Sequence, residues 1–212
     1  MTEEEALDLL QRVGAFRTGH FVFTSGQHSD TYINKDMIFV HPRETSLLCK
    51  GFAEAFKDAN IEAVIAPAVG AIILSQWTAY HLGEMTGRDV YGLYADKDGE
   101  GGLVIRRGYD KIIAGKRTLA VEDLLTTGGS LKKVVEAARA AGANVVGAMA
   151  IGNRGGVTRE AVGNPERFES LVDVHLEQWP EEECELCKKG IPVNPDIGHG
   201  KEFLARQKKE TS

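Results

Sequence analysis

Disulfide-forming cysteines, long apolar runs and excess positive charge are all scarce in this sequence of 212 residues. The three cysteines, Cys49, Cys184 and Cys187, are too few and too clustered for a disulfide framework. The segment from Thr2 to Glu5 is acidic, the reverse of the basic start of a secretory signal. No apolar stretch approaches the about 18 residues that a membrane span needs. These absences predict a cytoplasmic protein that does not insert into membranes.

Basic residues are in the minority. The chain has 25 lysines and arginines against 31 aspartates and glutamates, which gives a formal net charge of -6. Proteins that bind nucleic acid normally depend on a basic surface, so we expect no nucleic-acid partner. The length and the 42% content of hydrophobic residues suit one compact domain with an ordinary core.

The central part of the sequence alternates between two patterns. Short apolar runs at residues 63–66, 118–121 and 145–151 are separated by stretches with helical spacing of apolar residues. Strands without polar alternation that alternate with helices form parallel sheets covered on both faces. The sequence therefore predicts an α/β fold, an open and mainly parallel sheet flanked by helices.

The two ends of the chain depart from that rhythm. Residues 19–34 read as two strands around a polar turn. We predict one domain over residues 1–180, with a small hood near residues 1–40. Residues 181–212 are charged and read as a tail packed on the core.

Glycine is abundant, with 24 residues where average composition gives about 15 in a chain of this length. Three glycine-containing turns follow predicted strands, after Ala66, Tyr94 and Val121. In open parallel sheets, ligands bind at the carboxyl ends of the strands. These turns therefore predict one crevice at that edge of the sheet.

The turn after Val121 has the composition of an anion site. It contains the acid pair Glu122-Asp123 and then Thr126-Thr127-Gly128-Gly129-Ser130 before a helix. Small residues, hydroxyls and a helix N-terminus suit a phosphate, and ionised carboxylates accept hydrogen bonds from sugar hydroxyls. An ordinary strand-to-helix turn with Ser130 as the N-cap is the alternative interpretation.

The stretch at 96–102 is polar and rich in glycine, and predicts a mobile loop followed by a returning strand within 103–113. A solvated hairpin without a role in function is the alternative.

The motif from Val121 to Ser130 resembles the phosphoribosyl-diphosphate (PRPP) motif of the type I phosphoribosyltransferases. The order of the elements is similar to that of the orotate phosphoribosyltransferase branch. Blocks at 19–34, 65–70, 99–102 and 153–156 carry the rest of the resemblance, which covers about residues 5–160.

The resemblance implies roles for the matching residues. Glu122 and Asp123 would bind the ribose hydroxyls, with Asp123 also in the catalytic centre. The 5′-phosphate would be held by Thr126, Thr127, Gly128, Gly129 and Ser130, and the diphosphate loop would be Ala68, Val69 and Gly70. Lys97 best matches the catalytic lysine of the mobile loop, and Arg154 matches an arginine that binds the carboxylate of orotate.

The match is incomplete among the basic residues. Lys97 lies between Asp96 and Asp98 where the orotate branch has several bases, so we assign a catalytic role to Arg107 as well, with Arg106 and Lys111 as alternatives. His28 replaces a lysine expected after the Ser25-Gly26 turn, and Lys35 lies close by in sequence. Lys35 and His28 are therefore predicted to bind the base together with Arg154.

The implied reaction transfers the phosphoribosyl group of PRPP to a nucleobase, orotate first, with release of diphosphate. Mg²⁺ would act mainly through oxygens of PRPP, and the chain would form a homodimer. A purine-type phosphoribosyltransferase and a non-catalytic PRPP or nucleotide sensor are the alternatives.

The tail contains Cys184, Cys187 and His199, which together suggest a zinc site that lacks a fourth ligand. Packing of reduced thiols in the tail or at a dimer contact is the alternative. The isolated histidines, namely His20, His41, His81 and His175, read as surface or core residues.

Overall fold

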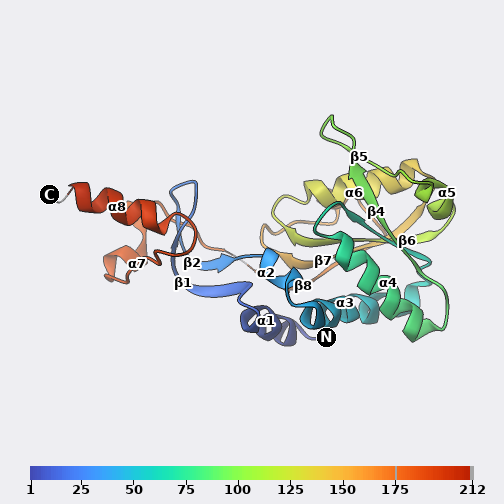
Figure 1. Ribbon diagram of the computed structural model, residues 1–212, viewed down its shortest axis with the longest axis horizontal. Coiled ribbons are helices and arrows are strands. Elements are labelled where there is room, and N and C mark those ends of the chain that lie inside the picture. Colours follow the sequence, from blue (N-terminus) through green and yellow to red (C-terminus); the bar gives the residue numbers. More distant parts are fainter. Residues whose placement is uncertain (175, 211–212) are drawn as a thin grey trace.

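The computed structural model describes residues 1–174 and 176–210 (Figure 1). Within these residues the strands form two sheets. Strands β1 (Phe16–Val22) and β2 (His28–Ile33) pair antiparallel as a separate hairpin. The larger sheet has six strands in the order β5-β4-β3-β6-β7-β8.

Five strands of the larger sheet run parallel: β3 (Ala63–Pro67), β4 (Tyr91–Lys97), β6 (Arg117–Leu125), β7 (Asn144–Asn153) and β8 (Arg167–Asp173). The short strand β5 (Leu103–Val104) returns antiparallel along the edge of β4. All five residues of β3 are buried, as expected for a central strand of a sheet covered on both faces. The predicted open, mainly parallel sheet is confirmed.

Helices cover both faces of this sheet (Figure 1). On one face, α1 (Glu3–Arg12), α3 (Pro42–Phe56) and α4 (Ile72–Thr86) bury residues such as Leu48, Phe52 and Leu74 in one apolar cluster. On the other face, α5 (Tyr109–Ile113) and α6 (Gly129–Ala140) contribute to a second cluster that includes Leu131 and Val134. The two cores fix the sheet and therefore the positions of its strand ends.

Three details differ from the prediction. Strand β8 and the one-turn helix α2 (Asp36–Phe39) were not predicted, because neither has a distinct apolar pattern. Strand β6 continues to Leu125, where it pairs with Asn153, so Glu122 and Asp123 belong to the strand and not to the turn after it. Their charges made this stretch read as a loop.

The tail lies against the β1–β2 hairpin, at the end of the molecule away from the large sheet (Figure 1). The tail contains α7 (Glu185–Lys188) and α8 (Gly200–Glu210), and the short turn η3 (Glu181–Glu183) precedes them. Another short turn, η2 (Glu160–Val162), lies earlier, between β7 and β8. Backbone bonds join Asn194 N–H to the His20 carbonyl and His199 N–H to the Val22 carbonyl, each at 2.8 Å. The sequence placed this tail on the core of the domain, whereas its described residues contact the hairpin.

Candidate functional site

The crevice lies where the order of the sheet reverses. From β3 the chain passes through α4 to β4 on one side, and from β6 it passes through α6 to β7 on the other. Because the two connections leave the strand ends in opposite directions, a gap opens between the ends of β3 and β6. The acid pair and the loop after Pro67 border this gap.

The two acids at the end of β6 are almost completely buried. Glu122 is 5% exposed and Asp123 is 2% exposed. The Leu124 N–H donates to Asp123 Oδ1 at 2.6 Å, and the Asp123 N–H donates to Glu122 Oε1 at 3.1 Å. These bonds to the backbone hold both carboxylates in fixed positions.

Lys35 reaches the acid pair from the segment that follows β2. Its Nζ lies 3.1 Å from Asp123 Oδ2 and 3.3 Å from Oδ1, although the two residues are 88 positions apart in the chain. The Lys35 side chain is half exposed and that of Asp123 is buried. The hairpin segment therefore supplies a cation to the floor of the crevice.

Burial and nearby charges shift the pKa values of Glu122 and Lys35. Burial, and then the charge of Asp123, raises the pKa of Glu122 to about 8. Partial burial of Lys35 works against its charge, but Asp123, Glu122 and Asp36 together raise the pKa of Lys35 above its ordinary value. Without a ligand, the site therefore contains two features. The Glu122 carboxyl keeps its proton into the neutral pH range, and Lys35 forms an ion pair with Asp123.

The N-terminus of α6 forms the second part of the site. Gly128 is the N-cap, with φ of 78°, and no side chain caps this helix. A Cβ on Gly128 would clash with Val157 and Val162, so this position needs glycine for both its backbone and its packing. Thr126, Thr127 and Ser130 are exposed around the turn. Uncapped N–H groups, hydroxyls and the helix dipole give this turn the properties of a phosphate site.

Ser130 is not the N-cap, so the ordinary turn that we considered as an alternative does not account for this serine. Its hydroxyl has no capping role among the described residues.

Arg154 stands beside the phosphate turn. Its N–H donates to the Leu125 carbonyl at 3.0 Å, directly after β7. A Cβ on Gly155 would meet the Thr126 carbonyl oxygen, so glycine lets the two turns approach each other. Among the described residues, the Arg154 guanidinium has no hydrogen bond or ion pair, and the side chain is half-buried. It is available to a ligand.

The loop after β3 closes the other side of the crevice. The Ala68 N–H donates to the Ala95 carbonyl at 2.9 Å, the Ala68–Val69 peptide bond is cis, and Val69 is exposed. A Cβ on Gly70 would lie 3.8 Å from Asp123 Oδ2. This loop and the acid pair are therefore direct neighbours.

The glycine-rich loop between β4 and β5 extends the crevice. A cavity of about 340 Å³ is lined by Ala68, Lys97, Gly101, Ser130 and Lys133, among others. The Lys133 Nζ donates to the Gly101 carbonyl at 2.5 Å and joins the loop to α6. Lys133 was not singled out from the sequence, although its position three residues after Ser130 places it on the same side of the helix.

The acids on either side of Lys97 have partners of their own. Asp98 Oδ1 accepts bonds from the Glu100 and Gly102 N–H groups at 2.8 and 2.9 Å, and these backbone bonds lower the pKa of Asp98. Asp96 lies 3.4 Å from the Arg107 guanidinium. Neither acid has a hydrogen bond or ion pair with Lys97 among the described residues, so its ammonium stays free at the mouth of the cavity.

A family model for the phosphoribosyl transferase domain matches residues 34–181. The chain belongs to the phosphoribosyltransferase family. It is 39% identical over 189 residues to a Thermus thermophilus protein named orotate phosphoribosyltransferase, a match that covers 89% of this chain and 98% of that protein. A Thermoanaerobacter protein of the same name is 39% identical over 195 residues, with 91% and 96% covered.

Solved structures share the fold. The orotate phosphoribosyltransferase of Mycobacterium tuberculosis in complex with Fe(III) dicitrate superposes with a TM-score of 0.64 at 22% identity, covering 81% of this chain and 95% of that chain. The same enzyme in complex with PRPP gives a TM-score of 0.59 at 22% identity, with 81% and 96% covered. At this identity the likeness supports the α/β architecture of this phosphoribosyltransferase and nothing finer.

Most of the residues predicted for the site of this phosphoribosyltransferase share one edge of the sheet. Lys35 pairs with Asp123, and Asp123 lies next to Gly70 of the loop at 68–70. Ala68 of that loop lines one cavity together with Lys97 and Ser130. Arg106 and Arg107 line a neighbouring cavity with Ala68, Val69 and Lys97. The predicted members therefore come together, with one exception.

His28 is the exception. It is completely buried, and its Nδ1 lies 2.8 Å from His20 Nε2, within the hairpin and not in the crevice. As the first residue of β2 its side chain turns inward, which a count from the Ser25-Gly26 turn did not predict. This position does not suit the base-binding role expected for His28.

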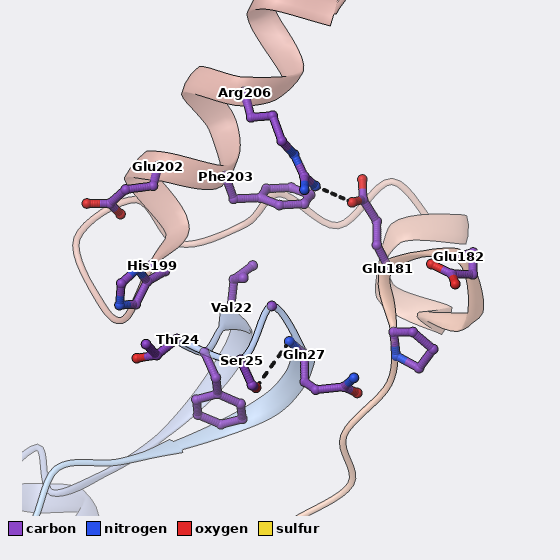
Figure 2. A pocket seen from close by; sticks show the side chains of 13 residues that line it. Val22, Thr24, Ser25, Gln27, Glu181, Glu182, His199, Glu202, Phe203 and Arg206 are labelled. Carbon is purple, nitrogen blue, oxygen red and sulfur yellow. Dashed lines mark hydrogen bonds and ion pairs between the residues drawn. The ribbon is translucent and has the colours of Figure 1, made fainter.

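A separate cavity of about 400 Å³ lies between the hairpin turn and the tail (Figure 2). His199 lines it together with Val22, Ser25 and Phe203, and the ion pair of Glu181 with Arg206 borders it. His199 is exposed there. None of the crevice residues of the phosphoribosyltransferase site lines this cavity.

No helix among the described residues is both long and apolar enough to span a bilayer.

Proposed function

We propose that this chain transfers the phosphoribosyl group of PRPP to orotate and releases diphosphate. The observation that carries the proposal is the buried acid pair next to the uncapped N-terminus of α6, at the reversal point of a parallel sheet. Sugar hydroxyls and a phosphate are the groups that these two features recognise. Relatives at 39% identity named orotate phosphoribosyltransferase support orotate as the acceptor.

The ribose 5-phosphate part of PRPP would occupy the acid pair and the phosphate turn. Glu122 and Asp123 would accept hydrogen bonds from the ribose hydroxyls. The turn from Thr126 to Ser130 would donate N–H and O–H groups to the phosphate. Their common origin at the end of β6 holds the two subsites in a fixed relation.

Lys35 has two arrangements in this proposal. In the ligand-free chain it neutralises Asp123. When a ribose hydroxyl donates a hydrogen bond to the Asp123 carboxylate in place of Lys35, the half-exposed Lys35 ammonium becomes available to the anionic groups of the substrates. We assign Lys35 to this exchange, and to contact with the base once PRPP is bound.

The diphosphate would lie against the loop at 68–70, under the β4–β5 loop. Its negative charge grows as the bond to C1 of the ribose breaks, and stabilising that charge is the main task of the site. We assign this task to Lys97 and Arg107, which line the cavity beside Ala68 and Val69. Backbone N–H groups bind the Asp98 carboxylate. This supports a role in which the Lys97 ammonium binds the diphosphate and does not pair with Asp98.

The base would enter beside Arg154. Orotate carries a carboxylate, and a guanidinium without a partner matches its two oxygens. In the transfer, a ring nitrogen of the base loses its proton to solvent and forms the bond to C1, while the C1–oxygen bond breaks and its electron pair leaves with the diphosphate. Closure of the glycine-rich loop would exclude water, which competes as the nucleophile.

Oxygen donors at the crevice suit Mg²⁺, which prefers such ligands. The only cluster of three or more potential metal ligands among the described residues lies elsewhere, so the protein offers Mg²⁺ no complete cage here. We propose that Mg²⁺ arrives with PRPP and that Glu122 and Asp123 face it through ribose hydroxyls and water. When bound it would supply neutralising charge to the diphosphate.

We also propose a cytoplasmic homodimer. The three free cysteines are consistent with a reducing compartment. Ile73, Tyr80 and Met85 of helix α4 are exposed, and Leu47 of α3 is exposed as well. Large apolar side chains gathered on adjacent helices favour association with a second copy.

The test is turnover of PRPP with Mg²⁺ and a panel of bases: orotate, uracil, adenine, guanine, hypoxanthine and xanthine. We expect release of diphosphate with orotate and little with the others. Turnover with a purine alone would identify the purine-type alternative. Tight PRPP binding without turnover of any base would overturn the enzyme assignment and favour the sensor.

A further inference from the structure

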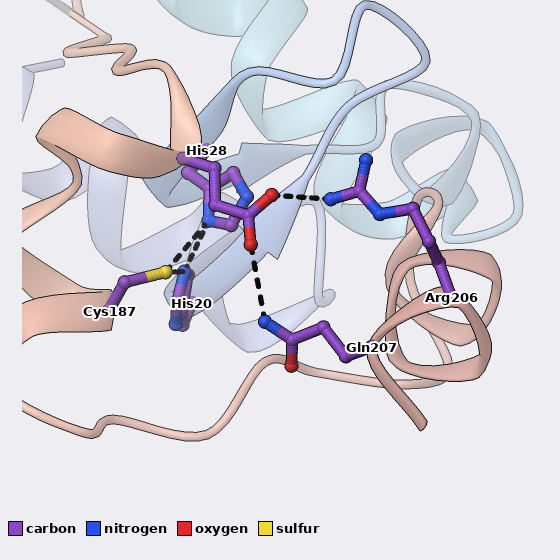
Figure 3. A network of polar contacts seen from close by, with 6 residues as sticks. His20, His28, Cys187, Arg206 and Gln207 are labelled. Carbon is purple, nitrogen blue, oxygen red and sulfur yellow. Dashed lines mark hydrogen bonds and ion pairs between the residues drawn. The ribbon is translucent and has the colours of Figure 1, made fainter. Parts of the chain in front are cut away.

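Two histidines and two cysteines converge between the hairpin and the tail. Figure 3 shows three of them, His20, His28 and Cys187. His20 lies on β1, His28 begins β2, Cys184 follows η3 and Cys187 lies on α7. One ligand atom from each residue lies within 4.8 Å of all the others. His20 and His28 are buried, Cys184 is completely buried and Cys187 is half-buried.

Distances in the cluster are near those of a tetrahedral metal site. Zinc bonds of about 2.05 Å to nitrogen and about 2.3 Å to sulfur place neighbouring ligand atoms about 3.3 to 3.8 Å apart. Three of the four sulfur-to-nitrogen distances, from Cys187 to His28 and from Cys184 and Cys187 to His20, are 3.4, 3.6 and 3.8 Å. The two histidine nitrogens are closer, at 2.8 Å. They share a proton at that distance, and a metal ion would replace this proton and part the rings by about 0.5 Å.

A contact outside the cluster sets the tautomer of His20. Its Nδ1 lies 2.7 Å from the Ile191 carbonyl oxygen, which accepts hydrogen bonds only. The Nδ1 of a neutral His20 therefore carries the proton, and the lone pair of Nε2 faces the cluster. Metal-binding histidines are oriented in this way, by a bond from the second ring nitrogen to a carbonyl or carboxylate.

The metal-free arrangement leaves a polar atom without a partner. With His20 Nε2 as acceptor, His28 Nδ1 donates the shared proton and His28 Nε2 becomes an unprotonated acceptor. That atom is buried and has no hydrogen-bond partner among the described residues. A metal ion on His28 Nδ1 would shift the ring proton to Nε2. The His28 ring packs edge-on against Phe203, with ring centroids 4.8 Å apart.

The contact between hairpin and tail has a small apolar core. Its buried members are Val22, Val193 and Phe203, with Leu204 partly buried beside them. Such a core is too small to hold 30 residues of tail by itself, and small structural units of this kind commonly depend on a metal or disulfides. His20 and Cys184 are 164 positions apart, so one ion would join the two ends of the chain.

We propose that His20, His28, Cys184 and Cys187 bind one Zn²⁺ ion that fixes the tail to the hairpin. Two nitrogens and two sulfurs in a tetrahedron suit zinc, and four protein ligands leave no open position for substrate, so the site is structural. Binding releases the two thiol protons to solvent. This site corrects two predictions: His20 is not an isolated residue, and His199 is exposed outside the cluster. His175 lies outside the described residues.

The first test is metal content of the full chain, purified without an affinity tag. We expect about one zinc per chain by mass spectrometry of the metal. Cys187→Ser and His28→Gln should each reduce bound zinc about tenfold or more, whereas the control His199→Gln should retain it. Retention by both ligand variants, or loss in the control, would contradict the assignment.

A second measurement uses the wild-type chain and does not require any variant to fold. The metal-free chain is titrated with Co²⁺ as the probe. Two thiolate ligands produce intense sulfur-to-cobalt charge-transfer absorption, and a tetrahedral site gives strong visible bands. We expect both, with a raised melting temperature. A chain isolated without zinc that gives neither signal, or whose Cys184 and Cys187 are joined as a disulfide, would refute the site.

Discussion

Asp123 is held by two kinds of partner, a backbone N–H within its own strand and an ammonium from a distant segment. The Leu124 N–H fixes Oδ1, and Lys35 pairs with both oxygens. These bonds hold the buried carboxylate in one orientation. It is therefore a ready acceptor for a ribose hydroxyl, and its charge matters more than its shape.

Replacing this charge with an amide of the same shape tests the ribose site. We expect Asp123→Asn to lower kcat/KM for PRPP about 10²- to 10³-fold, because the amide loses a charged acceptor and leaves Lys35 without its counterion. Steady-state kinetics of diphosphate release measure the effect. Glu136→Gln, which removes the charge of an exposed acid on α6 that pairs with Lys132, is the matched control. Equal kinetics in the two variants would mean that the ribose binds elsewhere.

Glu122 makes stability depend on pH. Its pKa rises from 4.5 to about 8 on folding, through burial and the charge of Asp123. Between these values the folded chain holds a proton that the unfolded chain has released, so the free energy of unfolding falls as pH rises from about 5 to about 8. We expect Glu122→Gln to remove this loss, which amounts to at most a few kcal/mol.

Chemical denaturation of both proteins at pH 5, 6, 7 and 8 measures the difference. His81, whose pKa is lowered by burial, acts in the opposite direction below about pH 6.5 in both proteins, so the comparison cancels it. Parallel pH profiles for the wild type and the variant would argue against a raised pKa of Glu122.

At the scale of the element, the phosphate turn depends on the backbone at the start of α6. Gly128 has φ of 78°, and its missing side chain makes room for Val157 and Val162. The next residue, Gly129, has no such limit: a Cβ there would meet only the Thr127 hydroxyl, at 3.5 Å. The structure therefore requires glycine at position 128 and sets no such requirement at position 129.

This difference gives a prediction with an internal control. Gly128→Ala should lower the free energy of unfolding by about 1 to 3 kcal/mol through backbone strain and overpacking. It should also weaken the binding of inorganic phosphate, because the turn must shift. Gly129→Ala should cost little stability, since alanine favours a helix. Thermal unfolding and phosphate titration of both variants give the answer, and equal losses of stability would remove the packing argument.

The elements also show where sequence reasoning succeeds and where it fails. Buried strands such as β3 and the motif from Val121 to Ser130 were predictable, because their signals are local: apolar runs, and small residues before a helix. The extension of β6 through Glu122 and Asp123 was not, since only its pairing with β7 makes two acids part of a strand. Edge strand β8 was missed because the exposed Arg167 and the partly exposed Glu169 interrupt its apolar pattern.

At the scale of the whole molecule, contacts between distant segments decide which residues form a site. Lys35 joins Asp123 across 88 positions, and His20 joins Cys184 across 164. No local pattern encodes either pairing. The sequence grouped Cys184 and Cys187 with His199, whereas the structure places His20 and His28 beside these cysteines. His199 was nearer in the chain, whereas the hairpin brings His20 and His28 nearer in space.

The outer side of α4 gives the last prediction. Ile73, Trp77 and Tyr80 recur at helical spacing, and Tyr80 is 54% exposed. A helix that is apolar on its outer side as well as toward the core needs a partner, and in a homodimer a second copy of the chain provides it. We expect the wild type to sediment as a dimer and Tyr80→Arg to shift it toward monomer, because like charges would meet across a symmetric interface. Ile191→Arg, at an exposed apolar position in the tail, should leave the dimer intact. A monomeric wild type, or dissociation by both variants alike, would rule out α4 as the contact.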